Sequence, residues 1–247
     1  IVGHKKMIQE TIFKITPSSV DYALRCTRCL WLNYKGIKID TFFPPIFNAI
    51  DLIQKKYLIT QSVKLISKRF PDGRIMNELT GFIGSQQLKD RKGRLFEIKG
   101  KTDLVIEFNT SPKRYGIIDL KTTSINPSKI QNYKFQLESY ATIFEKPNAK
   151  TPKFSNIDEL GLYLFEPKEI TNILDTSCNM KFETLYLKGD RCYLNLINRI
   201  TDIIDIYVME QPPKYNPSCS TCKFTKSLIE KKYIYLLVLL IIFKIFC

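Results

Sequence analysis

The chain has a single histidine, His4, among its 247 residues. A Ser-His-Asp or Cys-His mechanism needs a histidine base beside the nucleophile, so the sequence supplies both mechanisms poorly. Acidic residues are also few: 24 Asp and Glu face 38 Lys and Arg, a formal net charge of +14. This excess favours a polyanionic partner, most often nucleic acid. An AT-rich coding sequence would give the same bias, so charge alone decides little.

Long hydrophobic runs are also scarce. The apolar run from Tyr233 to Cys247 is interrupted by Lys244 and is shorter than the roughly 20 residues that cross a bilayer. Residues 225–247 therefore form a tail of uncertain status, open to three interpretations: a membrane anchor, a helix packed on the domain, or a non-native end. Residues 1–15 are a ragged segment without the apolar core of a secretory signal. We therefore expect a cytoplasmic protein with reduced cysteines.

Hydrophobic periodicity predicts one domain over residues 16–224. The expected helices are residues 16–34, 46–70, 126–145 and 191–209. The expected strands are a meander of 94–99, 102–108 and 115–122, then 160–165, closed by Pro167, and 181–188. This order indicates an α/β or α+β fold with a mixed central sheet flanked by helices.

Two carboxylates lie in apolar segments, where burying a charge costs free energy. Asp103 and Asp119 each interrupt a β-branched, apolar run, which is costly unless the carboxylate is paired or holds a metal. Lys121 follows Asp119 by two residues, so on a strand the two side chains share a face. The alternative is a structural ion pair between Asp103 and Lys121. Glu97-Ile98-Lys99 is a rival acid-x-lysine, but no acidic strand precedes it and no helix follows it directly.

These residue types suit metal-dependent cleavage of a phosphodiester. Oxygens of Asp103 and Asp119, with the backbone carbonyl of Leu120, can hold Mg²⁺ or Mn²⁺. Lys121 can orient water or stabilise the charge that develops on phosphate. Gln136 and Tyr140 lie four residues apart, on one face of the following helix, and can bind phosphate oxygens or brace Lys121. The alternative for this pair is an ordinary helix with a half-buried tyrosine.

Together these residues resemble the PD-(D/E)XK nuclease superfamily, in particular its RecB-like branch. The pattern G-x-x-D, D/E-x-K, Q-x-x-x-Y matches Gly100–Asp103, Asp119–Lys121 and Gln136–Tyr140 in order. The resemblance implies a metal-dependent DNA nuclease on a restriction-endonuclease-like sheet. Members usually carry a further ligand on an upstream helix, and Glu78 is the candidate here, with a surface glutamate as the alternative.

Four cysteines form two C-x-x-C pairs: Cys26 with Cys29, and Cys219 with Cys222. Four soft ligands suit Zn²⁺ or an iron–sulfur cluster, which here would clip the first helix to the end of the domain. The pairs resemble the cysteine clip of AddB-type and CRISPR-associated exonucleases. Those relatives usually place one cysteine in front and three behind, so 4Fe-4S and Zn²⁺ both stay open. Four unrelated buried thiols are the alternative.

The expected function is a metal-dependent DNA nuclease, an exonuclease on single-stranded ends in repair, recombination or defence. One alternative is an inactive nucleic-acid-binding module on the same fold, held to DNA by its basic charge. Another is a membrane-tethered protein of unrelated role. No helicase motif is present, so any unwinding would need a helicase subunit as partner.

Overall fold

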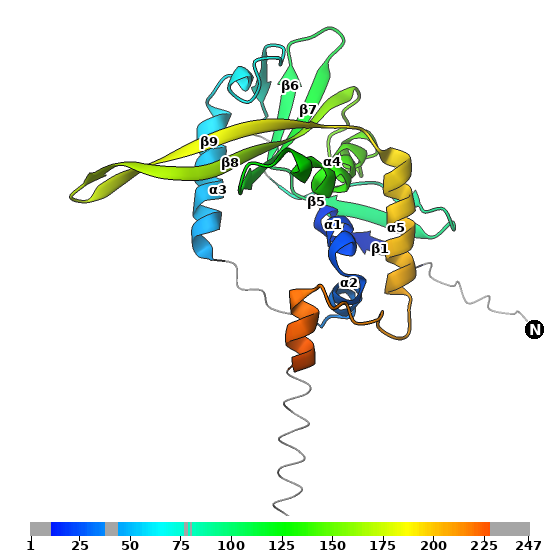
Figure 1. Ribbon diagram of the computed structural model, residues 1–247. Helices are drawn as coiled ribbons and strands as arrows, with labels where there is room; N and C mark the ends of the chain where they lie inside the picture. Colours follow the sequence, from blue (N-terminus) through cyan, green and yellow to red (C-terminus); the bar gives the residue numbers. More distant parts are fainter. Residues whose placement is uncertain (1–10, 38–43, 77–78, 80, 228–247) are drawn as a thin grey trace, which may run out of the picture. The chain divides into compact units, whose positions relative to one another are not determined.

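The computed structural model describes residues 11–37, 44–76, 79 and 81–227 (Figure 1). The chain divides into two compact units. The first comprises Ile1–Asp21 and Phe42–Thr201, and the second Tyr22–Thr41 and Asp202–Cys247. Each unit is described by itself below.

A five-stranded mixed sheet forms the centre of the first unit. Its strands, in spatial order, are β2 (Gly73–Ile75), β6 (Leu104–Phe108), β7 (Arg114–Thr122), β8 (Ile157–Leu174) and β9 (Ser177–Gly189). β7 and β8 run parallel and the other neighbours antiparallel. The parallel pair needs a crossover connection, which α4 (Ile130–Glu145) supplies. The predicted fold class, a mixed central sheet flanked by helices, is confirmed.

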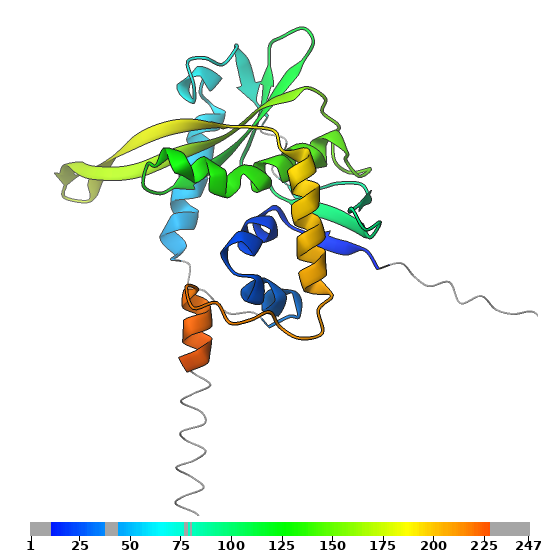
Figure 2. The same cartoon turned by 45° about the vertical axis from the view of Figure 1, so that its right-hand side comes forward.

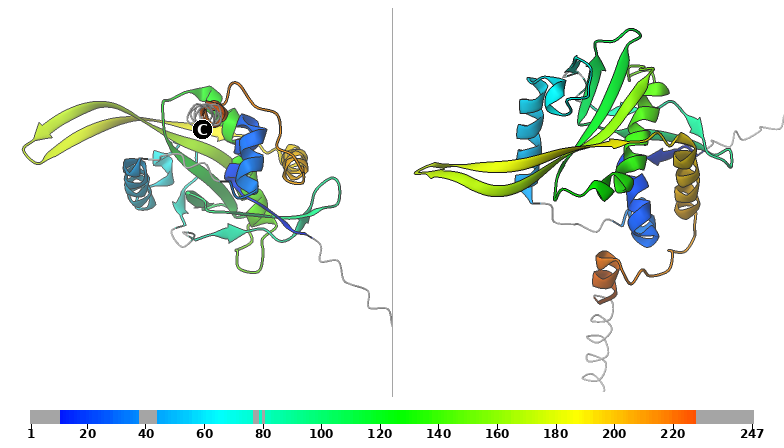
Figure 3. Two further views of the ribbon diagram at one scale, coloured as in Figure 1. Left: turned by 90° about the horizontal axis from the view of Figure 1, so that it is seen from below. Right: turned by 45° about the horizontal axis from the view of Figure 1, so that its top comes forward.

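Helices cover both faces of this sheet (Figure 3). On one face, α3 (Pro45–Ile59) and the short 3₁₀ helix η1 (Val63–Leu65) pack against the sheet. Their core includes Leu58 and Phe70 together with Ile118 and Leu120 of β7. Because strand side chains alternate, residues 117, 119 and 121 of β7 point to the opposite face, where α4 lies. A carboxylate at position 119 is therefore enclosed between the sheet and α4.

α4 is anchored by an ion pair between a buried glutamate and a partly exposed arginine. Glu138 is fully buried, and its two oxygens accept hydrogen bonds from the Arg191 guanidinium, each at 3.0 Å. The same guanidinium binds Glu145 and the carbonyl of Ile157. Arg191 thus holds α4 against the start of β8 and the end of β9 through a fork of charge-assisted bonds.

A second, smaller sheet surrounds β5 (Leu95–Gly100). β5 pairs in parallel with β1 (Phe13–Ile15) and antiparallel with β3 (Ile83–Gly84) and β4 (Leu88–Lys89). The predicted meander is therefore wrong at its first strand, because β5 does not pair with β6. Gly100, Lys101 and Thr102 suggested a tight hairpin turn, but the chain there passes from one sheet to the other.

Several predicted element boundaries are wrong. The first helix is broken into α1 (Pro17–Arg25) and α2 (Thr27–Tyr34), because Cys26 adopts an extended conformation, with φ −162° and ψ 109°. α3 ends at Ile59, and Ser62 begins a separate 3₁₀ turn by accepting a hydrogen bond from the amide of Lys64. Val63, Ile66 and Phe70 are buried at a spacing of three and four residues, which mimics a continuing helix.

β8 also continues beyond Pro167, where the sequence suggested a stop. The ladder with β9 shifts register between Pro167 and Glu169, so the proline lies at a bulge, where its missing N–H is tolerated. The resulting β8–β9 hairpin extends well past the rest of the sheet (Figure 2).

The second unit includes α2 and the end of α5 (Tyr193–Tyr207). Within it, the Trp31 indole donates a hydrogen bond to the carbonyl of Met209 at 2.9 Å. Tyr34 stacks on Tyr207 with ring centroids 3.8 Å apart. None of the helices in the described ranges is both long and apolar enough to cross a membrane. Of the predicted tail, 225–247, only residues 225–227 are described, and the apolar run from 233 to 247 lies outside the described residues.

Candidate active site and cysteine cluster

The end of the β6–β7 ladder brings the two predicted carboxylates together. β6 begins at Leu104, which pairs with Ile118 of the antiparallel β7. Asp103 lies directly before that pair, and its side chain accepts a hydrogen bond from the backbone N–H of Leu120, the residue between Asp119 and Lys121. Asp119 and Lys121 share one face of β7. The structure therefore places Asp103, Asp119 and Lys121 at one edge of the sheet.

Asp119 is the most enclosed member of this site. Its side chain is buried, and its Oδ2 lies 2.5 Å from the Lys121 ammonium. Its Oδ1 accepts a hydrogen bond from Gln136 Nε2 at 3.2 Å. The strand and α4 thus each hold one oxygen of the same carboxylate.

Asp103 connects β7 to α3. Its Oδ2 accepts a hydrogen bond from the backbone N–H of Leu120 at 2.8 Å, and its Oδ1 lies 2.7 Å from Lys55 Nζ. In an extended strand the N–H and C=O of one residue point to the same side. The Leu120 carbonyl therefore points toward the side on which Asp103 lies.

The charges at this site perturb one another. Burial raises the pKa of Asp119 to about 7; the negative charge of Asp103 adds to the rise and the Lys121 ammonium opposes it. Burial lowers the pKa of Lys121, but its ion pair with Asp119 outweighs burial, and the net pKa is raised. Lys121 therefore stays a fixed cation, while burial makes the Asp119 carboxylate harder to ionise.

These donors fit a hard divalent cation. The carboxylates of Asp103 and Asp119 and the carbonyl of Leu120 are the oxygen ligands that Mg²⁺ and Mn²⁺ prefer. The raised pKa of Asp119 comes first from burial, and the negative charge of Asp103 adds to it. A bound cation would stabilise the ionised form of this buried carboxylate.

Gln136 and Tyr140 lie behind Asp119. Both are buried, and Gln136 Nε2 donates to the Tyr140 hydroxyl at 3.3 Å as well as to Asp119. Gln136 thus braces Asp119 rather than Lys121. The structure explains why the G-x-x-D motif has a glycine at position 100. A Cβ there would lie 2.8 Å from Pro17 Cδ and 3.2 Å from Tyr140 Cε1. A glycine lets β5 pass close to the Tyr140 ring.

Sequence reasoning missed the contribution of α3. Lys55 binds both Asp103 and Asp51, each at 2.7 Å, and Gln54 Nε2 donates to Thr122 Oγ1 at 3.1 Å. The local signal was an acidic and a basic residue four apart, Asp51 and Lys55, in a mostly apolar helix. The candidate upstream ligand, Glu78, lies outside the described residues.

The rival tripeptide Glu97-Ile98-Lys99 lies on β5, in the smaller sheet. Glu97 binds Lys14 at 2.5 Å, and the Lys99 ammonium lies over the Phe82 ring, 5.9 Å from its centroid. Glu97 is thus held in a surface ion pair, and Lys99 lies against an aromatic ring. This pair makes a matched control for the Asp119–Lys121 pair.

The four predicted cysteines meet in the second unit. Cys26 Sγ lies 3.5 Å from Cys222 Sγ, and Cys29 Sγ lies 3.6 Å from Cys219 Sγ and 3.8 Å from Cys222 Sγ. All four sulfurs are within 4.8 Å of one another and could hold a metal or a cluster. Burial raises the pKa of Cys219, but the Cys222 amide and the neighbouring thiols lower it to about 7.

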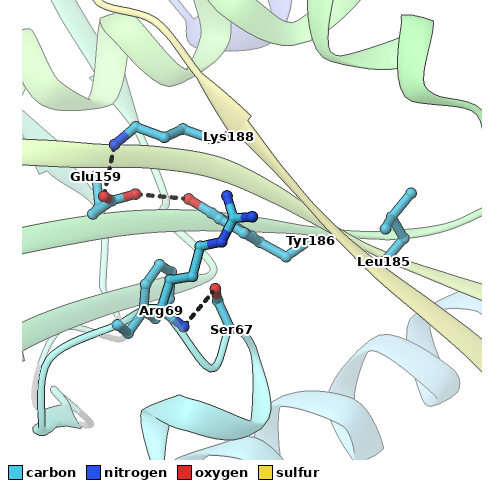
Figure 4. A pocket seen from close by; sticks show the side chains of 7 residues that line it. Ser67, Arg69, Glu159, Leu185, Tyr186 and Lys188 are labelled. Carbon is cyan, nitrogen blue, oxygen red and sulfur yellow. Dashed lines mark hydrogen bonds and ion pairs between the residues drawn. The ribbon is translucent and has the colours of Figure 1, made fainter.

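A separate pocket of 540 Å³ opens at the far end of β8 (Figure 4). Within it, Glu159 accepts from Lys188 at 2.7 Å and from the Tyr186 hydroxyl at 3.1 Å. Glu159 pairs with Gly116 and Phe165 with Thr122, so this pocket lies roughly 20 Å along the strands from the end of β7 that carries Asp119 and Lys121. It takes no part in the carboxylate site.

Comparison with known proteins identifies the family and the fold. Residues 53–227 match the family model of the PD-(D/E)XK nuclease superfamily. The crystal structure of SSO0001 is similar, with a TM-score of 0.52 and 15% sequence identity, over 87% of this chain and 85% of that chain. At that identity the likeness carries the fold alone. Among curated proteins, none matches.

Proposed function

We propose a function from one premise: the chain belongs to the PD-(D/E)XK nuclease superfamily. We infer a divalent-metal-dependent deoxyribonuclease that acts as an exonuclease on single-stranded ends, in repair, recombination or defence. The observation that carries the proposal is the meeting of Asp103, Asp119 and Lys121 at one sheet edge. Two carboxylates and a fixed cation are what hydrolysis of a phosphodiester needs.

Asp103, Asp119 and the Leu120 carbonyl would hold the metal. When bound, Mg²⁺ or Mn²⁺ lowers the pKa of a water and offsets charge on the phosphate. Lys121 keeps its positive charge and stabilises the negative charge that develops during attack. Gln136 and Tyr140 fix the orientation of Asp119, and Lys55 holds Asp103, so these three are positioning residues.

The test is cleavage of end-labelled single- and double-stranded DNA, with Mg²⁺, with Mn²⁺ and with EDTA. We expect metal-dependent cleavage that the Lys121→Ala variant loses by about 10²- to 10³-fold. Lys99→Ala, the matched lysine of β5, should cut at the parental rate. Equal cleavage by Lys121→Ala and the parent would refute the site.

The second candidate function is a non-catalytic DNA-binding module, which the formal charge of +14 favours. It predicts salt-dependent DNA affinity and no turnover with either metal. The same assay therefore separates the two. A helicase subunit would supply single-stranded ends to such an exonuclease, and we propose one as a partner.

We further propose that the four cysteines hold one Zn²⁺. For a Zn–S bond of about 2.3 Å, the edge of the tetrahedron is about 3.8 Å. The three sulfur pairs at 3.5, 3.6 and 3.8 Å fit that edge. The thiolates of a 4Fe-4S cluster each bind a different iron atom and stand farther apart. Metal analysis should find zinc; a broad visible absorption with bound iron would show a cluster instead.

A further inference from the structure

An apolar groove of 270 Å³ lies beside the carboxylate site, between α3 and the base of the β8–β9 hairpin. Its lining residues are mostly aliphatic or aromatic: Ile50, Ile53, Gln54, Tyr57, Leu58, Phe165 and Phe182. Ligand pockets for drug-sized molecules run from roughly 300 to 1,000 Å³, so this groove suits one flat ring system. Figure 1 shows α3 where β8 and β9 leave the sheet.

Aromatic rings line both sides of this groove. Tyr57 on α3 is 58% exposed and the neighbouring Ile53 66% exposed, although both are large apolar side chains. On the hairpin, the Phe165 and Phe182 rings meet edge to face, with centroids 6.5 Å apart. Exposed aromatic surface of this kind is costly in water and marks a place where another flat apolar group binds.

The groove lies on the α3 face of the sheet, next to the edge at which the carboxylates meet. Gln54 lines it and donates to Thr122, the residue after Lys121. Phe165 pairs with Thr122 in the β7–β8 ladder. Lys55, the next residue of α3, binds Asp103. A strand with its phosphate at the carboxylates therefore has neighbouring nucleotides within reach of the groove.

We propose that this groove binds an unpaired nucleobase of the substrate strand, adjacent to the phosphate that is cut. The inference rests on the proposed nuclease function and names its substrate class. Bases in a duplex are stacked on one another and cannot enter, whereas every unpaired base offers a π-face to Tyr57, Phe165 or Phe182. The groove thus selects single-stranded DNA without reading its sequence.

The test compares a single-stranded oligonucleotide with the same oligonucleotide carrying abasic residues beside the cut position. Stacking on one aromatic side chain is worth about 5- to 100-fold in affinity. Tyr57→Ala should raise KM for the base-bearing strand by that factor, and Tyr57→Phe should restore it. With the parent, KM for the abasic strand should be higher than KM for the base-bearing strand by the same factor. Tyr57→Ala should raise KM for the abasic strand little further. Leu52→Ala, an exposed position on α3 outside the groove, is the matched control.

Three outcomes would overturn the groove assignment. One is equal KM values for base-bearing and abasic strands in the parent. Another is an equal loss for Tyr57→Ala on single- and double-stranded DNA. The third is a Tyr57→Ala variant that changes self-association, measured by light scattering, and leaves DNA affinity unchanged, because a second copy would then cover the groove.

Failure of the nuclease proposal is distinguishable. If the parent cuts nothing, anisotropy of labelled oligonucleotides in metal-free buffer tests the groove by itself. Tighter binding of the base-bearing strand than of the abasic strand, reduced in Tyr57→Ala, supports the groove. Equal binding of both strands refutes it.

Discussion

The two candidate metal sites are built in different ways. Asp103, Asp119 and Lys121 are close in sequence and are positioned by the ladder between two neighbouring strands. The two cysteine pairs are far apart in sequence: Cys26 and Cys222 are separated by 196 residues. The carboxylate site can therefore keep its geometry without metal, because sheet hydrogen bonds hold it. The cysteine site gathers two chain segments whose closure costs conformational entropy that a bound metal would offset.

The two sites also differ in the charges that surround their ligands. At the carboxylate site, Lys55 and Lys121 already pair with the two carboxylates, and burial is the main reason that the pKa of Asp119 is raised. At the cysteine site, four thiols face one another with no cation among the contacts described. We expect the first site to act in catalysis with little effect on stability, and the second to act in stability.

The largest expected effect is on the activity of Asp119→Asn. Cleavage should fall by at least about 10³-fold, because the variant loses a metal ligand and the partner of Lys121. Its free energy of unfolding in EDTA at pH 8 should stay the same or rise slightly, because a buried, strained carboxylate is removed. Single-turnover cleavage and urea denaturation measure the two. A large loss of stability would mean that the site is structural.

Cys222→Ser should show the reverse pattern. The variant should lose bound metal and unfold the second unit at lower temperature, because structural zinc contributes on the order of 10 kcal/mol in small peptides. Metal analysis and limited proteolysis of the segment after Asp202 would show it. Cys178→Ser, at an exposed position of the hairpin, should change neither. Equal metal content in both variants would contradict the cluster.

Gly100→Ala should give a smaller, mixed effect. The added Cβ meets Pro17 and Tyr140, so the variant should lose about 1–3 kcal/mol in urea denaturation. Cleavage should also fall, since Tyr140 contacts Gln136 behind Asp119. Gly81→Ala is the control, because no atom of the described residues beyond its chain neighbours lies within 4 Å of the added Cβ. Equal losses in the two variants would show that the close approach is unimportant.

The smallest effect concerns two cysteines outside the cluster. Burial, with the charge of Glu138, raises the pKa of Cys192 to about 11. Below that pH its thiol is protonated and alkylates slowly, with a rate that rises about tenfold per pH unit. Cys178 is exposed and should react first. Site-resolved mass spectrometry after iodoacetamide at pH 7, 8 and 9 measures both. Equal rates at pH 8 would place Cys192 in a different environment.

Much of the fold could be predicted from the sequence, because periodicity is local. Alternation placed β6 and β7 close to their observed bounds and found the second half of β9, which begins four residues earlier, at Ser177; Asn126 and Pro127 marked the turn that leads into α4. The failures occurred where long-range packing overrides local signals. Pro167 lies at a bulge of a hairpin, and the buried residues after Ile59 belong to a turn with a helix-like spacing.

Sequence alone determined which side chains share a face: Asp119 with Lys121 on a strand, and Gln136 with Tyr140 on a helix. By the same reasoning Glu97 and Lys99 share a face of a strand. Only the tertiary structure distinguished the Glu97–Lys99 pair from the Asp119–Lys121 pair, because it puts β5 in another sheet. Tertiary structure also brought Lys55 to Asp103, joined cysteines from opposite ends of the chain, and opened the aromatic groove. The reason is physical: side-chain direction follows from local backbone geometry, whereas the choice of neighbouring strand or helix depends on burial summed over the whole chain.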